Sequence, residues 1–312
     1  MRYAPLSTLA QSDGLVNGIP LFQMIDGNVF YVDSGGSGVQ ADGSFNKPMT
    51  TIDGAINKCT AGNNDHIFVK AGHAETISDA SSLNCDLADV AIIGMGHGNS
   101  RPRITFDTAT TTTIPVTADN IMFKNIIFSA NFADVAACFT LAAAEYFTLV
   151  DCSFTFTATN MNFVDIVDTS AVANAEDNLT FARCDFIDSD TGTGSLVNVD
   201  EDLDGLTILD CDVRLGVNGV LPCLADVAAD KDLTDVNIQR NFTYRLVDGS
   251  AVTLIQVATT TANTGYIADN SSRHLDIADE LTATAGTNFS FFRNKASGVI
   301  GLQGYLLPGT DS

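Results

Sequence analysis

The chain has 312 residues, of which 45% are hydrophobic, and its 38 acidic residues outnumber 15 Lys and Arg to give a net charge of −23. This charge repels nucleic acid and anionic lipid, so neither is an expected partner. No apolar run approaches the roughly 18 to 20 residues that cross a bilayer, so no membrane segment is expected.

The N-terminal region is predicted to hold an arm and a cap. Residues 1–27 mix Leu, Ile, Phe and Met with Gly and Pro, as an extended arm would, whether it covers the first coil or a neighbouring protein. The first ten residues carry one Arg and no continuous apolar stretch, so no signal peptide is expected. A strand at Val29–Val32 is followed by a short helix, capped by Thr50 or Thr51 and ended by Gly62. Because the end of a solenoid exposes its core, this helix is expected to plug the first coil.

A repeat of eight residues begins at residue 90, and its successive starts lie 24 to 32 residues apart. The copies are VAIIGMGH from Val90, IMFKNIIF from Ile121, FTLVDCSF from Phe147, LTFARCDF from Leu179, LTILDCDV from Leu206, VNIQRNFT from Val236, GYIADNSS from Gly265 and FSFFRNKA from Phe289. The third position is large and apolar in every copy, from Ile92 to Phe291. Such a repeat indicates strands that stack on copies of themselves, one coil per repeat.

The sixth position of the repeat forms a column of small residues. It is occupied by Cys152, Cys184 and Cys211 and then by Asn241, Asn270 and Asn294. We expect buried, reduced thiols that continue into a ladder of Asn side chains at a coil corner, bonded amide to amide. Three thiols stacked about 4.8 Å apart cannot surround a metal ion tetrahedrally, so the column is expected to be structural.

The fifth position alternates in charge from coil to coil. It reads Asp151, Arg183, Asp210, Arg240, Asp269 and Arg293. Each Asp therefore has an Arg directly above or below it at strand spacing. This predicts neutralised cross-strand pairs on one solvent-facing edge, a structural ladder rather than a catalytic groove.

A second strand is predicted in each coil, ahead of the repeated segment. These strands are Phe139–Leu141, Phe163–Ile166, Leu196–Val199, Leu224–Val227 and Leu254–Val257. Together the elements predict an all-β, right-handed parallel β-helix of about eight to ten coils with a short N-terminal capping helix. We expect an arm at residues 1–27, the β-helix at 28–298 and a tail or cap at 299–312.

Three segments near the N-terminus carry a family resemblance. They read FYVDSGGSG, GSFNKPMTTIDGAINKCTAGNNDHIFVKAGHAE and VAIIGMGHGNSRPRITF. They resemble the opening of pectin-lyase-like single-stranded right-handed β-helix proteins, among them phage virion-associated β-helix proteins, over Asn28 to about Gly298. This superfamily includes lyases, hydrolases, adhesins and virion proteins, so the resemblance implies the fold and leaves the function open.

The sequence shows no complete catalytic or metal-binding motif. A glycosidase of this fold needs two or three carboxylates about 5 to 9.5 Å apart on one face, and many Asp pairs here satisfy that only by chance. Of the hydrolase signature that the superfamily implies, only Gly96-His97-Gly98 is present, and we interpret it as a turn. No two of the four His lie three or four residues apart, so no helical metal pair is expected.

One acidic loop is a weak candidate for calcium. Asp200, Asp202, Asp204 and Gly205 match the start of a calcium-binding loop, but Cys211 stands where the bidentate Glu should be. We interpret the loop as an acidic, solvated turn, and no cofactor is expected.

A rigid rod without visible catalytic groups suits a structural role. The sequence therefore favours a non-enzymatic virion protein, a phage capsid decoration or cement protein at the particle surface. We expect a homotrimer that binds the major capsid protein or another virion protein. The alternatives are a tail spike or fibre that binds a receptor, or a carbohydrate-active β-helix enzyme, either lyase or hydrolase.

Overall fold

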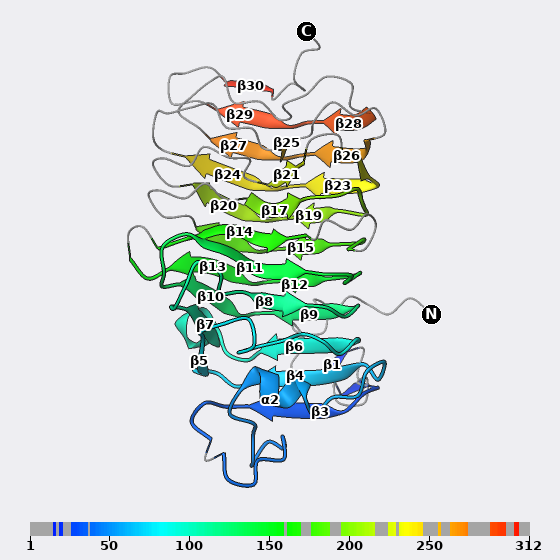
Figure 1. Cartoon of the computed structure of the whole chain (residues 1–312). Coiled ribbons are helices and arrows are strands. Elements are labelled where there is room, and N and C mark those ends of the chain that lie inside the picture. The colour runs from blue at the N-terminus through cyan, green and yellow to red at the C-terminus, as the bar shows by residue number, and fades with distance from the viewer. Residues whose placement is uncertain are drawn as a thin grey trace.

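The structure is a computed structural model that describes residues 15–16, 19–20, 26–36, 38–158, 161–169, 176–187, 195–215, 224–228, 231–245, 255–256, 263–273, 288–297 and 303–305. They form a right-handed parallel β-helix whose chain passes through three sheets in each complete turn (Figure 1). The predicted fold class is confirmed.

Two sheets have ten strands each. The first long sheet contains β3 (Val29–Val32), β4 (Asp65–Val69), β6 (Val90–Gly94), β9 (Ile121–Lys124), β12 (Thr148–Val150), β15 (Thr180–Ala182), β19 (Thr207–Leu209), β23 (Val236–Gln239), β26 (Thr264–Ala268) and β28 (Asn288–Phe292). The second long sheet contains β5 (Ala74–Ile77), β7 (Arg103–Phe106), β10 (Ile127–Ala130), β13 (Ser153–Phe156), β16 (Asp185–Ile187), β20 (Asp212–Leu215), β24 (Phe242–Arg245), β27 (Ser271–Arg273), β29 (Lys295–Ser297) and the antiparallel β30 (Gln303–Tyr305).

The short sheet closes the coil on its third side. It contains β8 (Ile114–Val116), β11 (Val135–Leu141), β14 (Phe163–Asp168), β17 (Ser195–Val199), β21 (Ala225–Val227) and β25 (Ile255–Gln256). These include all five predicted second strands. Because only this sheet completes the three-sided turn, the solenoid has about six full turns, and the coil count differs from the predicted eight to ten.

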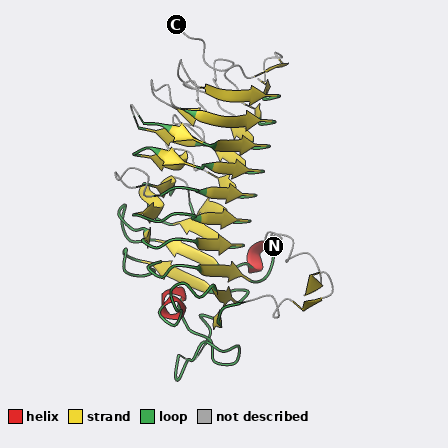
Figure 2. Ribbon diagram, turned by 90° about the vertical axis from the view of Figure 1, so that its right-hand side faces the viewer, coloured by secondary structure: helices red, strands yellow, loops and turns green. Residues whose placement is uncertain are grey.

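The remaining elements are short. They are β1 (Leu15–Val16), β2 (Ile19–Pro20), β18 (Leu203–Asp204), β22 (Leu233–Thr234), the helix α2 (Ile52–Ile56) and the 3₁₀ turn η2 (Gly98–Ser100). The side chain of Thr51 caps α2 by accepting a hydrogen bond from the backbone N–H of Gly54. Ile52, Ala55 and Ile56 of α2 are buried in the core, and α2 lies at the N-terminal end of the stack (Figure 2). Among the described residues, no helix is long and apolar enough to cross a membrane.

From Ile121 on, each predicted eight-residue segment spans parts of two strands joined by a sharp corner, whereas the segment from Val90 contains β6 alone. Two residues form each of these corners between the long sheets, as Asp151 and Cys152 do between β12 and β13. The first corner residue is in the left-handed region, with φ of 55° at Asp151, 53° at Arg183 and 55° at Asp210. The second points into the core, where Cys152 is fully buried. The corner thus explains why one position of the repeat is charged and the next is small.

The interior is filled by columns of large side chains. Phe128 and Phe154 stack on consecutive coils with ring centroids 5.2 Å apart, and Phe139 packs between Phe123 and Phe147, each 5.1 Å away. All of these rings are buried, and parallel strands place the same row of every coil about 4.8 Å above the last. Most of the predicted arm at 1–27 and tail at 299–312 lies outside the described residues, so the division into three segments stays a prediction.

Candidate functional site

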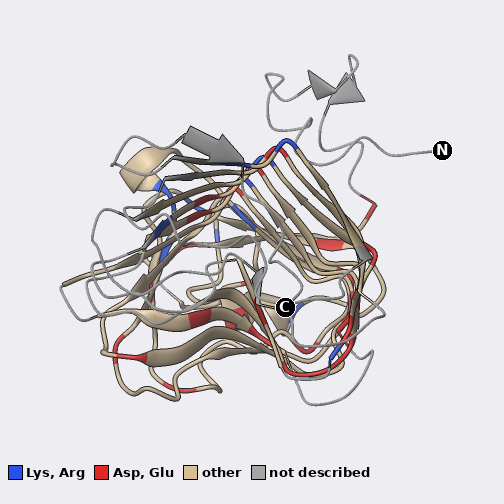
Figure 3. Ribbon diagram, turned by 90° about the horizontal axis from the view of Figure 1, so that it is seen from above, with Lys and Arg blue, Asp and Glu red and all other residues tan. Residues whose placement is uncertain are grey.

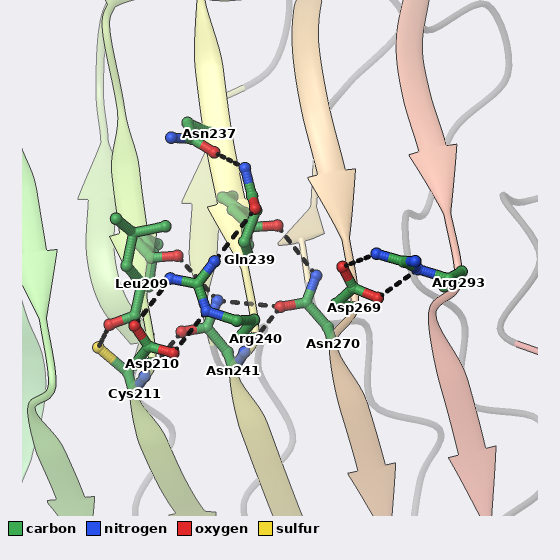
Figure 4. A network of polar contacts seen from close by, with 12 residues as sticks. Leu209, Asp210, Cys211, Asn237, Gln239, Arg240, Asn241, Asp269, Asn270 and Arg293 are labelled. Carbon is green, nitrogen blue, oxygen red and sulfur yellow. Dashed lines mark hydrogen bonds and ion pairs between the residues drawn. The ribbon is translucent and has the colours of Figure 1, made fainter.

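The charged fifth position of the repeat lies at the corner between the long sheets. Asp151 accepts two hydrogen bonds from Arg183, from Nε at 2.7 Å and from Nη2 at 3.2 Å. Asp210 binds Arg240 in the same way, and Figure 4 shows this pair beside the similar pair of Asp269 and Arg293. The Arg240 and Arg293 guanidinium groups lower the pKa of the Asp210 and Asp269 carboxyl groups.

These are the pairs that the alternating charges predict. Their members occupy left-handed corner positions, where Asp is common and Arg is not. Seen along the stacking axis, basic and acidic residues gather at this corner (Figure 3). Both oxygens of each Asp are occupied by an Arg, so this corner offers no free carboxylate for catalysis.

The sixth position forms a buried column directly inside the corner. The Oδ1 atom of Asn241 accepts a hydrogen bond from the Cys211 N–H at 2.9 Å, and Oδ1 of Asn270 accepts one from the Asn241 N–H at 3.0 Å. Asn294 binds the Asn270 N–H in the same way, at 3.1 Å. Cys152, Cys184 and Cys211 are buried and free of disulfides. Burial raises the pKa of the Cys184 thiol well above its usual value, so it is not a nucleophile.

The predicted calcium loop does not converge. Oδ1 of Asp202 accepts a hydrogen bond from the Asp232 N–H at 2.9 Å, and Oδ1 of Asp204 accepts one from the hydroxyl of Thr234 at 2.7 Å. Asp200 lies after β17, on another side of the coil. No group of three metal-ligating side chains with suitable geometry occurs in the described parts of the chain.

The backbone conformation of the same loop requires glycine at Gly205. Its φ is 86°, and it occupies the left-handed turn that Asn178 takes in the preceding coil and Asp235 in the following one. A Cβ atom at Gly205 would lie 2.7 Å from Oδ1 of Asn178. The Asp-Gly sequence therefore serves the turn of the solenoid.

The histidines do not form a site among the described residues. His97 lies exposed in the turn before η2, where its N–H binds the Ser100 hydroxyl. His73 is buried, with Nδ1 accepting a hydrogen bond from the Ser34 N–H and Nε2 lying 3.0 Å from Oε2 of Glu75. Oε2 of Glu75 also accepts a hydrogen bond from the Ile52 N–H, so this pair ties α2 to the first coils. His274 lies outside the described residues.

The short sheet carries a concentration of half-buried carboxylates that the sequence reasoning missed. Asp168 on β14, Asn198 on β17 and Asp226 on β21 are Cα partners in three successive strands. Asp165 lies in a second row of β14, and Asp200 follows β17 directly. The neighbouring side chains of β14, Ile166 and Val167, belong to the core. We refer to these five polar residues, on or directly after β14, β17 and β21, together as the acidic face.

Asp165 receives its hydrogen bonds from only one of its two neighbouring strands. Its neighbour on β17 is Ser195, whose N–H and hydroxyl both donate to Oδ1, at 3.1 and 2.7 Å. Its neighbour on β11 is Ala137, which has no polar side-chain atom. Oδ2 of Asp165 has no hydrogen-bond partner among the described residues.

Asn198 joins two further carboxylates. Its Nδ2 donates to Oδ1 of Asp168 at 2.8 Å and to Oδ1 of Asp200 at 3.3 Å. These two oxygens therefore lie at most about 6 Å apart, close to the separations of paired carboxylates in glycosidases. The amide holds both groups in fixed positions.

Burial raises the pKa of the carboxyl groups on the acidic face. Burial is the main cause that raises the pKa of Asp165 to about 6, with Asp168 and Asp226 adding repulsion and the Ser195 bonds acting in the opposite direction. Burial also raises the pKa of Asp168 and of Asp226. No Lys or Arg contributes to these shifts. A carboxyl group that is half protonated near pH 6 can donate a proton and take it back.

The sequence contained a weak signal for this face. Its strands read FVDIVD from Phe163, SLVNVD from Ser195 and ADV from Ala225, each with an acidic or amide residue beside the apolar positions. Only the apolar positions entered the strand predictions. The register that aligns Asp168 with Asn198 and Asp226 comes from the pairing of the strands.

The chain is similar in fold to two solved structures of other proteins. One is the pectin methylesterase from Aspergillus niger in deglycosylated form, with a TM-score of 0.49 and 14% identity, covering 88% of this chain and 86% of that chain. The other is the GH136 lacto-N-biosidase from Eubacterium ramulus, with a TM-score of 0.32 and 9% identity, covering 89% and 69%. No protein-family model and no curated protein matches the chain. At these identities the likeness concerns the fold.

Both neighbours are carbohydrate-active enzymes by name, and neither is a virion protein. This finding contradicts the prediction of a non-enzymatic phage capsid decoration protein, and the resemblance to phage proteins is not shown. The prediction examined the neutralised corner for catalytic groups and did not consider the acidic face. The homotrimer and the absence of nucleic-acid and membrane partners stay predictions. The chain is thus a right-handed parallel β-helix with a group of half-buried carboxylates on its short sheet.

Proposed function

We propose that the chain is a carbohydrate-active hydrolase that cleaves a glycan at the acidic face. The observation that carries the proposal is the buried position of the Asp165 carboxyl group beside other half-buried carboxyl groups, which raises its pKa to about 6. Pairs of carboxyl groups with different proton affinities supply the acid and the base of glycoside hydrolysis.

The roles follow from the two environments. Asp165 is the general acid and protonates the glycosidic oxygen as the bond to the leaving sugar breaks. Asp168, held by the Asn198 amide, is the base and takes a proton from the water that attacks the anomeric carbon. Asp165 and Asp168 lie three residues apart on β14, which places their Cα atoms roughly 10 Å apart.

The charges favour a hydrolase over a lyase. A lyase that acts on uronic acids needs cations to bind the sugar carboxylate and to remove a proton. Within the described parts of the chain, no Lys or Arg is among the main causes that shift the pKa of Asp165, Asp168 or Asp226. A net charge of −23 also repels a polyanionic chain, so the substrate is a neutral glycan.

The proposal is tested by measuring product release from a panel of neutral and uronate oligosaccharides. The wild-type protein should cleave a neutral glycan near pH 5 to 6, and Asp165→Asn should reduce the rate by about 10²- to 10⁴-fold. The control is Asp235→Asn, the same change at an exposed turn of another side of the coil. Release of no product from any glycan, or equal loss in both variants, would contradict the proposal.

A further inference from the structure

Ser195 on β17 contacts Asp165 on β14 across two adjacent coils. Ser195 is 1% exposed and lies directly beside Asp165 as its partner on β17. It gives Oδ1 two donors, one from its backbone N–H and one from its hydroxyl. On the other flank, Ala137 gives none. The carboxyl group is therefore held from one side and through one oxygen.

We propose that Ser195 is the positioning residue of the catalytic acid: it engages Oδ1 of Asp165, so that Oδ2 is the oxygen that holds and transfers the proton. This inference rests on the proposed function. An oxygen that already accepts two hydrogen bonds is the poorer site for a proton, and Oδ2 has no partner among the described residues. The proton therefore resides on Oδ2.

The contact is compatible with both protonation states of the acid. An ionised carboxylate only accepts hydrogen bonds, and a carboxylic acid protonated on Oδ2 still accepts through Oδ1. Ser195 can therefore keep both bonds while Asp165 gives up its proton and regains it. Because the hydrogen bonds are the same in both states, proton transfer requires no rearrangement of Ser195.

The hydrogen bonds from Ser195 lower the pKa of Asp165, whereas its other surroundings raise it. The charges that face Asp165 are carboxylates, Asp168 from its own strand and Asp226 from β21, while β11 contributes the uncharged Ala137. Burial and these two carboxylates strengthen the hold on the proton, whereas the bonds from Ser195 weaken it. The hydroxyl thus keeps the proton exchangeable near neutral pH.

The test is the titration of the Asp165 carboxyl carbon, followed by ¹³C NMR with the signal assigned through Asp165→Asn. Ser195→Ala removes the hydroxyl and keeps the N–H, so the midpoint should rise by about one pH unit. Ser195→Thr keeps the hydroxyl and should titrate like the wild type. Ser271→Ala is the matched control, because it is the same change at an exposed position of β27, in a different sheet from Asp165. It should leave the Asp165 midpoint in place.

Kinetics then separate positioning from a purely structural role. On a cleaved glycan, Ser195→Ala should lower kcat with little change in KM and should move the alkaline limb of the pH profile upward. An unchanged Asp165 midpoint in Ser195→Ala, or an equal shift in Ser195→Thr, overturns the role of Ser195 whether or not hydrolysis is seen. Absence of hydrolysis by the wild-type protein refutes the proposed function instead, and the catalytic part of this inference with it.

Discussion

Replacement of Asn270 by alanine should destabilise the solenoid through the buried ladder. The side chain of Asn270 makes four hydrogen bonds, each at 3.0 Å. Oδ1 accepts from the backbone N–H and from Nδ2 of Asn241, and Nδ2 donates to the Ile238 carbonyl and to Oδ1 of Asn294. Asn241 and Asn270 are 1% and 2% exposed, so water cannot replace the lost partners.

The expected loss follows from the groups left without partners. The alanine variant leaves two buried donors of Asn241 unsatisfied, and each costs about 1–3 kcal/mol. Two carbonyl-type acceptors also lose one donor each, so the free energy of unfolding should fall by about 3–5 kcal/mol. For a chain of this size the Tm should drop by roughly 6–15 °C.

Thermal unfolding followed by far-UV circular dichroism measures the effect. Ser271→Ala is the matched control, because Ser271 is the next residue along the chain and its side chain is exposed. That variant should stay within about 0.5 kcal/mol of the wild type. If the Tm of Asn270→Ala matches that of Ser271→Ala, the ladder does not stabilise the fold and the reasoning is refuted.

Three further changes test other parts of the molecule. Cys211→Asn should raise the free energy of unfolding by about 1 kcal/mol and increase the Tm, because the amide oxygen of the new Asn can accept a hydrogen bond from the Cys184 N–H. A lower Tm would contradict the ladder geometry. Arg240→Asn should change stability by less than about 1 kcal/mol in urea titrations, because the lost pair with Asp210 is largely exposed and Asn tolerates a left-handed turn; a loss above 2 kcal/mol by that measure would refute this. Asp165→Asn should be more stable than the wild type at pH 7 and equal to it near pH 4. The sign follows from a folded pKa of about 6 against 3.8, since the folded state keeps a proton that the unfolded state loses, and stability falls as pH rises from about 4 to 6. Urea titrations at pH 4 and pH 7 that give the same difference between the two proteins would exclude a raised pKa at Asp165.

The stacking of the fold was predictable because each coil repeats the same chemistry. A large apolar third position returns in every copy and a small sixth position in the six copies from Phe147 on, and only stacking buries both columns at once. The helix cap at Thr51 was also predictable, since a hydroxyl before a helical turn can accept the free N–H of Gly54. The left-handed backbone of the corners was not predictable, because Asp, Arg and Asn share one position whose φ the strand pattern does not reveal.

The acidic face could not be found by spacing along the chain. Asp168, Asn198 and Asp226 lie in one row, but the coils between them differ in length, and the row exists only once the strands are paired. The raised pKa of Asp165 likewise depends on burial and on the Ser195 bonds, which no local sequence pattern shows. Sequence reasoning therefore examined the row that the repeat made visible, the corner pairs headed by Asp151, and found it neutralised.

The pH dependence of kcat/KM on a neutral glycan tests the central claim most directly, because it reports the ionisation of the free enzyme's essential acid. If Asp165 donates the proton, kcat/KM of the wild-type protein should fall tenfold per pH unit above a midpoint of about 6. Asp165→Asn should lose this limb together with most of the rate. A profile that stays flat to pH 8, or one that Asp165→Asn leaves unchanged, would contradict the assignment of the acidic face as the site of hydrolysis.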